Sequence, residues 1–273
     1  MPLRALTREV STALADCELT FLDREPIDVG RAAIQHDAYC ATLASLGLEV
    51  IRLPGDPGLP DCCFVEDTAV VVDEVAVLTS MGALSRRGEG AAVAAALARD
   101  REIVRIEPPA RIDGGDVLVV GRRVFVGQSG RTDAAGARAL AGALGPFGYE
   151  VIPVSVPGCL HLKSAATALD AETLLVNAEW IDLAPLSAYE LVHVDPAEPW
   201  AANVLAVPGG VLAHRGFPRT LERLAARGYP IHPVDVSEIL KAEAGVTCKS
   251  IVYAPRASAS RPPVDFRPAR SST

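Results

Sequence analysis

The 273-residue sequence contains no apolar run of the roughly 18 residues that a membrane-spanning helix needs. The segment that begins Met1-Pro2-Leu3-Arg4 lacks the apolar core of a secretory signal peptide. Basic residues are not in excess either, because 26 lysines and arginines stand against 34 acidic residues, for a net charge of −8. These absences predict a cytoplasmic protein with no membrane partner, and they argue against nucleic acid as a partner.

Paired cysteines are also missing. The six cysteines, at positions 17, 40, 62, 63, 159 and 248, form no C-x-x-C pair and show no zinc-ligand spacing. In a chain with no export signal we expect them to be reduced thiols, and the sequence implies neither a metal nor a cofactor. The excess of acidic residues suits a small cationic substrate, because net negative charge raises the local concentration of cations.

What the sequence does contain is a repeat. Hairpins of two short apolar strands begin near residues 64, 113, 161 and 203, and a fifth unit with a single apolar strand begins at 248, so that the steps are 49, 48, 42 and 45. Helical patterns and lone apolar strands fill the intervals, and a period in the forties is typical of a propeller or a solenoid. The sequence therefore predicts an α/β fold, a five-bladed α/β propeller of hairpin–helix–strand units, with an ordinary α/β sandwich as the alternative. We expect one domain over residues 1–257 and a disordered Ser/Pro/Arg-rich tail over 258–273.

Chemically reactive side chains open the five units of the repeat. They are Glu66 and Asp67, Asp113, His161, Asn203, and Cys248. If the ring closes, these side chains converge on its centre, where a cysteine nucleophile needs a group that favours the thiolate and an acid that protonates the leaving group. His161 suits the second role, because the pKa of histidine lies near neutral pH.

The carboxylates of this set restrict the substrate. A carboxylate raises the pKa of a nearby thiol, so its presence fits best if a cation such as a guanidinium lies between it and the sulfur. Taken singly, each residue also has a structural interpretation: Cys248 as a buried thiol, His161 as a core histidine and Asp113 as a turn residue.

Several short motifs, taken together, resemble the dimethylarginine dimethylaminohydrolase family. They are Pro60-Asp61-Cys62-Cys63-Phe64-Val65-Glu66-Asp67, Ser85-Arg86-Arg87-Gly88-Glu89, Asp113-Gly114-Gly115-Asp116, Arg131-Thr132, His161-Leu162-Lys163-Ser164, Ala201-Ala202-Asn203 and Thr247-Cys248-Lys249-Ser250. The resemblance runs in order from about residue 19 to residue 253. It implies the pentein fold, a five-bladed α/β propeller shared by enzymes that modify guanidines.

The resemblance implies a hydrolase of guanidine C–N bonds that needs no cofactor. Such an enzyme converts asymmetric dimethylarginine and monomethylarginine to citrulline and an amine through a covalent thiouronium on cysteine. By position, Cys248 is the nucleophile, His161 the general acid and base, and Asp113 the residue that orients His161.

The resemblance also implies how the substrate, a small cationic amino acid, is held. By position, Asp61, Glu66 and Asp67 surround the guanidinium end, Arg86 and Arg131 bind the α-carboxylate, and the backbone oxygens of Leu19 and Ala242 contact the amino-acid end. Relatives of this kind are often dimers, so the resemblance raises a homodimer as well.

Two other interpretations stay open from the sequence. One is a hydrolase or deiminase of another substituted or free arginine, although full arginine deiminases carry an inserted helical module for which 273 residues leave no room. The other is a non-catalytic propeller that only binds a partner, which has no need of Cys248, His161, Asp113 and two arginines together.

Overall fold

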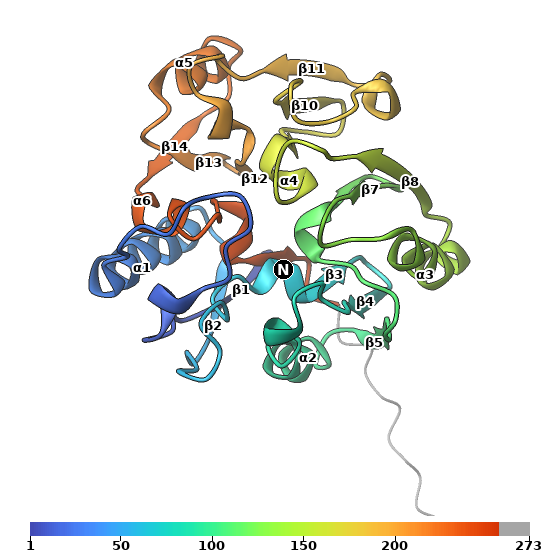
Figure 1. The fold of residues 1–273 in the computed structure, drawn as a ribbon. Helices are drawn as coiled ribbons and strands as arrows, with labels where there is room; N and C mark the ends of the chain where they lie inside the picture. The colour runs from blue at the N-terminus through green and yellow to red at the C-terminus, as the bar shows by residue number, and fades with distance from the viewer. Residues whose placement is uncertain (257–273) are drawn as a thin grey trace, which may run out of the picture.

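In the computed structural model, which describes residues 1–256, five three-stranded sheets surround a common centre as blades (Figure 1). In each of the four blades that follow one another in the chain, an inner strand pairs antiparallel with a middle strand, and the middle strand pairs parallel with an outer strand. The five-bladed α/β propeller predicted from the repeat is therefore confirmed.

The strands of these four blades follow the predicted order of hairpin and lone strand. Grouped by blade, they are β3 (Ala69–Val71), β4 (Val75–Leu78) and β5 (Glu102–Arg105); β6 (Val117–Val120), β7 (Arg123–Gln128) and β8 (Glu150–Ser155); β9 (Ala166–Ala168), β10 (Thr173–Val176) and β11 (Glu190–His193); and β12 (Leu205–Val207), β13 (Gly210–His214) and β14 (Ile231–Val234).

The fifth blade joins the two ends of the described chain. Here β1 (Arg4–Arg8) lies between β15 (Ile251–Tyr253), to which it is antiparallel, and β2 (Glu49–Leu53), to which it is parallel. The sequence predicted only one strand for the unit that Cys248 opens, because its partners come from the far end of the chain. This pairing closes the ring.

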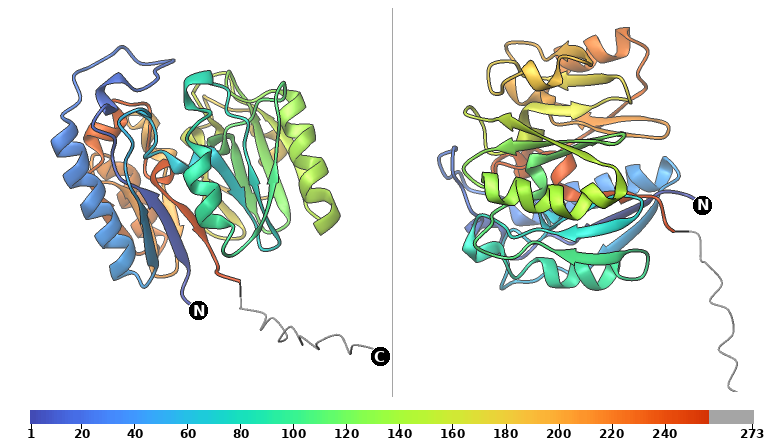
Figure 2. Two further views of the ribbon diagram at one scale, coloured as in Figure 1. Left: turned by 90° about the horizontal axis from the view of Figure 1, so that it is seen from below. Right: turned by 90° about the vertical axis from the view of Figure 1, so that its right-hand side faces the viewer.

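Longer helices cover the outside of four blades (Figures 1 and 2). They are α1 (Val29–Ser45), α2 (Gly90–Leu97), α3 (Ala134–Leu144) and α5 (Pro218–Ala226). Two begin at an aspartate whose side chain accepts a backbone N–H of the first turn, Asp28 from Arg31 and Asp133 from Gly136.

One blade departs from the predicted hairpin–helix–strand unit. Between β10 and β11 the chain forms only the 3₁₀ turn η6 (Ala184–Leu186), so the prediction of a helix in every unit is wrong at this blade. In the connection from residue 177 to residue 189, the side chains of Asn177 and Asp182 accept the N–H groups of Glu179 and Ala184, so two side-chain turns occupy the place of a helix.

A single helical turn precedes the innermost strand of each blade. These turns are η2 (Val65–Thr68), η4 (Gly114–Asp116), α4 (Leu162–Ala165), η7 (Pro199–Ala202) and η8 (Thr247–Lys249). The turn η2 contacts η4 and η8, and α4 contacts η4 and η7. The five turns thus form the centre of the ring and carry the reactive residues that open the units.

Within residues 1–256, no helix is both long enough and apolar enough to cross a membrane. The predicted tail over 258–273 lies outside the described residues, and the assignment of residues 1–257 to one domain stays a prediction.

Candidate active site

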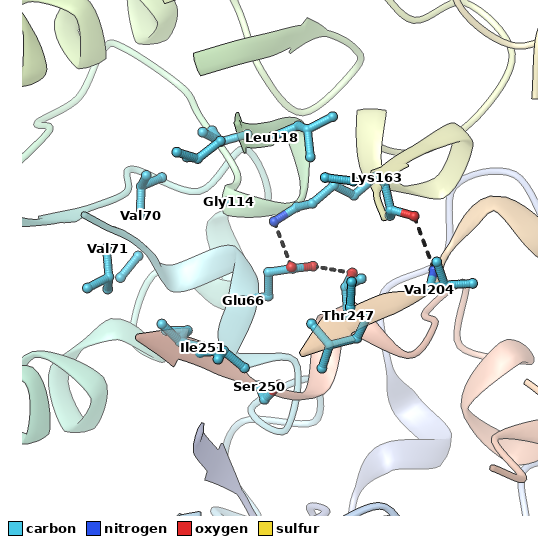
Figure 3. Close-up of a pocket in the computed structure, with 18 residues that line it drawn as sticks. Glu66, Val70, Val71, Gly114, Leu118, Lys163, Val204, Thr247, Ser250 and Ile251 are labelled. Carbon is cyan, nitrogen blue, oxygen red and sulfur yellow. Dashed lines mark hydrogen bonds and ion pairs between the residues drawn. The ribbon is translucent and has the colours of Figure 1, made fainter. Parts of the chain in front are cut away.

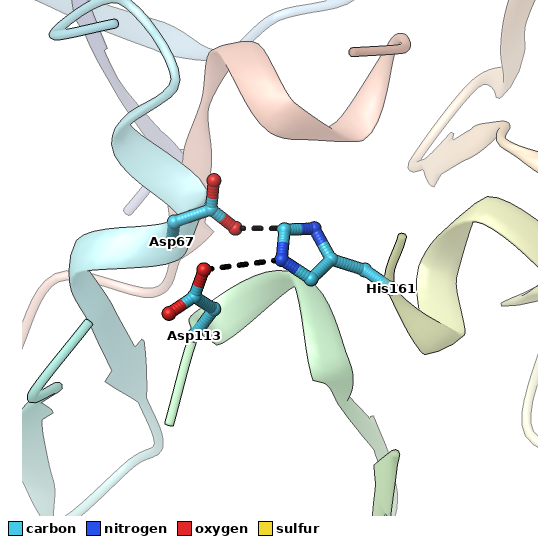
Figure 4. Close-up of side chains that lie close together, drawn as sticks. All are labelled: Asp67, Asp113 and His161. Carbon is cyan, nitrogen blue, oxygen red and sulfur yellow. Dashed lines mark hydrogen bonds and ion pairs between the residues drawn. The ribbon is translucent and has the colours of Figure 1, made fainter. Parts of the chain in front are cut away.

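At the centre of the ring, two carboxylates hold the imidazole of His161 (Figure 4). Nε2 of His161 lies 3.1 Å from Oδ2 of Asp113, and Nδ1 lies 3.8 Å from Oδ1 of Asp67. Burial lowers the pKa of His161, but the charge of Asp67 and the hydrogen bond to Asp113 outweigh it and raise the pKa to about 9. At neutral pH His161 is therefore an imidazolium that can donate a proton.

The Asp-Gly-Gly-Asp motif lets these groups approach one another. A Cβ on Gly115 would lie 2.5 Å from Nδ1 of His161 and 2.6 Å from Oδ1 of Asp67, and a Cβ on Gly114 would lie 2.0 Å from the carbonyl oxygen of Glu66. The N–H of Gly115 donates to Asp67 over 2.9 Å. Glycine is thus required at both positions because the backbone of η4 touches the neighbouring turn and the imidazole.

Cys248 occupies the middle of η8 and is 9% exposed. The N–H of Gly245 donates to its sulfur over 3.3 Å. Burial, followed by the charges of Glu66 and Asp67, raises the pKa of the Cys248 thiol to about 12. The resting side chain is therefore a neutral thiol, as expected from the acidic residues in the sequence.

The buried guanidinium of Arg86 holds Asp67 in place. Its Nη1 donates to Oδ2 of Asp67 over 2.8 Å, while Nε and Nη2 donate to the two oxygens of Glu89 over 3.0 and 2.9 Å. Burial raises the pKa of Asp67, but the positive charges of His161 and Arg86 outweigh this and lower it to about 2. Asp67 is therefore ionised whenever His161 is charged.

Arg131 approaches the same site from the other side. One guanidinium nitrogen, Nη2, donates to Oγ1 of Thr20 over 2.9 Å, and the other, Nη1, lies 3.9 Å from Oδ2 of Asp113. Within the described residues Nη1 is buried without a hydrogen-bond partner. Of the two arginines predicted to bind the α-carboxylate, Arg131 therefore has a free donor, whereas Arg86 already pairs with two protein carboxylates.

Glu66 lines a cavity of about 300 Å³ (Figure 3). Its carboxylate accepts from Nζ of Lys163 and from Oγ1 of Thr247, each over 2.6 Å. The inner strands of the blades line the rest of this cavity, and Asp67, His161 and Cys248 do not line it. The structure therefore separates Glu66 from Asp67, its neighbour in the sequence.

The remaining predicted residues are Leu19, Ala242 and Asp61. Leu19 and Ala242 pack in the same apolar cluster as Cys248. Asp61 is buried and accepts the N–H of Glu18 over 3.1 Å, which places it next to Leu19. Burial raises the pKa of Asp61, although the charge of Arg86 opposes this.

Sequence reasoning missed several residues that support the site. Asn203 was noted only as the opening residue of its unit, yet its Oδ1 accepts the N–H of Thr247 over 3.0 Å and its Nδ2 donates to the carbonyl oxygen of Lys163 over 2.9 Å. Asp116 accepts the N–H of Leu162 over 2.9 Å and so fixes the turn that follows His161. Their place at the start of an inner strand was the available signal.

Asp67, Asp113 and His161 could also serve as a metal-binding set, because one ligand atom of each lies within 4.8 Å of the others. With a pKa of about 9, His161 would have to release its proton to coordinate a metal, so metal binding at this set would strengthen as pH rises.

Comparison with known proteins assigns the fold and the family. The N-terminal domain of ArgZ, an arginine dihydrolase from cyanobacteria, superposes with a TM-score of 0.85 and covers 94% of this chain and 99% of that domain. Its sequence identity is 18%, so this likeness shows the fold alone. The structure of dimethylarginine dimethylaminohydrolase from Pseudomonas aeruginosa, a cysteine-to-serine mutant complexed with citrulline, superposes with a TM-score of 0.88 at 31% identity and covers 93% of this chain and 100% of that one. The fold is therefore that of the pentein enzymes.

The sequence matches agree with the structural ones. The family model for eukaryotic N,N dimethylarginine dimethylhydrolase matches residues 20–184. The N(G),N(G)-dimethylarginine dimethylaminohydrolase of Streptomyces coelicolor is 39% identical over 249 residues, which cover 91% of this chain and 96% of the relative. The chain belongs to the dimethylarginine dimethylaminohydrolase family.

Proposed function

We propose that this protein hydrolyses asymmetric dimethylarginine and monomethylarginine to citrulline and dimethylamine or methylamine. Family membership supports this reaction. The main structural support is that His161, with a pKa of about 9, lies between Asp67 and Asp113 in the same ring of turns as the buried Cys248. A proton donor and a thiol in one ring of turns are the two groups that displacement of an amine from a guanidinium requires.

The proposed reaction begins when the substrate cation binds beside the neutral Cys248 thiol. The positive charge favours the thiolate, the thiol proton leaves to solvent, and the sulfur attacks the guanidinium carbon. The imidazolium of His161 then gives its proton to the departing amine, which leaves a thiouronium on Cys248. Neutral His161 takes a proton from water, the resulting hydroxide attacks the same carbon, and citrulline leaves as the thiolate is released.

Three groups of residues are proposed to hold the substrate. Asp61 and Asp67 attract the guanidinium: the charge of Asp67 contributes to the raised pKa of Cys248, and Asp61 is buried beside Glu18, the residue before Leu19. Arg131 binds the α-carboxylate through its unpartnered Nη1. The carbonyl oxygens of Leu19 and Ala242 accept from the α-ammonium.

The proposed roles of Glu66 and Arg86 are less direct. Glu66 supports the site from the cavity side by fixing Thr247, the residue before Cys248. Arg86 orients Asp67, and its role toward the α-carboxylate stays a prediction because its donors already meet Asp67 and Glu89.

Citrulline formation on a panel of substrates tests the proposal. The panel contains arginine, monomethylarginine, and symmetric and asymmetric dimethylarginine, each assayed with the wild-type protein and with Cys248→Ser. We expect citrulline from monomethylarginine and asymmetric dimethylarginine with the wild type alone. Turnover of arginine but of neither methylated form would assign a deiminase instead, and no citrulline from any of the four would refute the proposal.

Location and assembly are further proposals. We infer a cytoplasmic location, supported by six cysteines that are all free thiols in the structure. A homodimer rests on the family resemblance, and light scattering of the purified protein tests it.

A further inference from the structure

The loop that contains Leu19 is held by one carboxylate. Oε1 of Glu243 accepts the backbone N–H groups of Thr20, Phe21 and Leu22, and Oε2 accepts that of Thr20 as well; the two bonds from Thr20 measure 2.9 Å each. Three successive N–H groups that converge on one anion form a strong, charge-assisted contact. The side chains of Phe21 and Leu22 are 48% and 36% exposed, so their packing adds little to this contact.

Glu243 occupies a backbone position at which glycine is usual. It follows α6 (Ser237–Leu240) and has a φ of 55°, the only positive φ of a non-glycine residue among residues 1–256. Glycine normally fills such a left-handed position after a helix, since any other side chain strains it. Glu243 is only 6% exposed, so its side chain does not simply extend into water. The strain is offset by what the carboxylate binds.

The loop and Glu243 connect the groups proposed to receive the amino-acid end of the substrate. Ala242, whose carbonyl oxygen is one proposed acceptor for the α-ammonium, directly precedes Glu243, and Leu19, the other, directly precedes Thr20. Thr20 in turn accepts from Arg131, the proposed partner of the α-carboxylate, over 2.9 Å. One carboxylate therefore ties both carbonyl-bearing segments together beside Arg131.

We propose that Glu243 is a positioning residue: its carboxylate locks the loop of residues 19–22 to the segment after α6 and so sets the spacing of the two carbonyl oxygens that bind the α-ammonium. This inference rests on the proposed function. It assigns to Glu243 an effect on recognition of the amino-acid end and none on the chemistry at the guanidinium carbon.

Two variants of the full-length protein separate the carboxylate from the backbone strain. Glu243→Gln keeps the shape and removes the charge, whereas Glu243→Gly removes the side chain and relieves the left-handed strain. In both we expect faster hydrogen exchange at the amides of residues 20–22. We also expect a KM for asymmetric dimethylarginine that rises roughly 10- to 100-fold, the range for loss of charged hydrogen bonds, with kcat within about threefold of wild type. Glu243→Gly should unfold at the same temperature as wild type or higher.

Glu238→Gln is the matched control. Glu238 is also buried and lies on α6, the short helix that precedes Glu243, and its carboxylate accepts the N–H of Asp28 over 2.9 Å and Nζ of Lys241 over 2.8 Å. This control should leave exchange at residues 20–22 and the KM unchanged. A second measurement compares the inhibition constants of two inhibitors: citrulline, and the citrulline analogue that has hydrogen in place of the α-ammonium. The Glu243 variants should bind citrulline more weakly than the wild type does and should bind the analogue equally well.

The outcomes distinguish this inference from the proposed function. Unchanged exchange at residues 20–22 in both variants would overturn the lock. Faster exchange with an unchanged KM, or an equal loss of affinity for both inhibitors, would overturn its role in recognition. A wild-type protein that makes no citrulline from methylated arginines would refute the proposed function instead, and amide exchange would still decide whether Glu243 holds the loop.

Discussion

Lys249, the residue after Cys248, offers the sharpest test of the electrostatics inferred for the core. Its side chain is completely buried, and within residues 1–256 its Nζ has no hydrogen-bond partner. The Nζ lies 3.9 Å from the centre of the Tyr39 ring. Burial lowers the pKa of Lys249 from 10.5 to about 7, opposed by the thiols of Cys40, Cys63 and Cys248. We predict that Lys249→Met stabilises the protein at neutral pH.

The magnitude and its dependence on pH follow from this pKa. A fall from 10.5 to about 7 corresponds to a penalty of about 5 kcal/mol for keeping the charged amine in the folded state. Between pH 7 and pH 10.5 the unfolded chain binds more protons than the folded chain, so wild-type stability rises with pH across this window. Below pH 7 the penalty is constant. Methionine carries no charge and fills a similar volume, so the variant should gain about 2 to 5 kcal/mol at pH 6.5 and progressively less towards pH 10.

Denaturant unfolding at several pH values between 6.5 and 10 measures the effect. Lys241→Met is the control, because the Nζ of Lys241 bonds to Glu238 and to the carbonyl oxygen of Pro26 near the surface. Loss of such a pair should change stability by less than about 1 kcal/mol. A Lys249→Met variant that is no more stable than wild type at pH 6.5, or whose advantage does not shrink as pH rises, would refute the assignment of an uncompensated buried amine.

Three further predictions concern the catalytic groups. Cys248→Ser should form no detectable citrulline while its circular dichroism spectrum stays that of the wild type; turnover in this variant would remove Cys248 as the nucleophile. The kcat should fall above about pH 9, where His161 loses the proton that the amine requires, and a profile that stays level to pH 10.5 would assign the acid elsewhere. Gly115→Ala should lower kcat at least about tenfold, because the added Cβ would displace the His161 ring and the Asp67 carboxylate; a kcat equal to that of the wild type would show that the contact can relax.

The propeller could be predicted from the sequence because the strands of each blade, apart from the one that closes the ring, follow one another in the chain. A hairpin of β-branched residues and a lone strand recur at steps near 45, and no long-range information is needed to see them. Two features of the fold were not predicted from this local pattern, one because it depends on a distant contact. The pairing of β1 with β15 joins residues 4–6 to residues 251–253, and two side-chain turns occupy the place of a helix between β10 and β11.

The sequence predicts which side chains gather at the centre of the ring. It does not predict which hydrogen bonds and ion pairs each of them makes there. The position of Cys248, His161 and Asp113 at the head of their units predicted that they share one ring of turns. Adjacent residues in a helical turn point in different directions. Glu66 and Asp67 are neighbours in one motif, yet Glu66 pairs with Lys163 at the cavity and Asp67 lies against the imidazole of His161. The pairing of Arg86 with Glu89 was not predicted either. It depends on the helical turn η3 (Leu84–Arg86) and the residues that follow, which bring the two side chains together.

The charges around Cys248 indicate how its thiolate forms. Among the cationic groups that the structure describes at the ring of turns, Lys163 is paired with Glu66, Arg86 with Asp67 and Glu89, and His161 with two aspartates. These three charges are compensated, the unpartnered amine of Lys249 has a pKa of only about 7, and burial together with the charges of Glu66 and Asp67 raises the pKa of Cys248 to about 12. A bound guanidinium adds the positive charge that the site lacks. For the proposed nucleophile Cys248, we therefore infer that the positive charge of the bound substrate favours the thiolate.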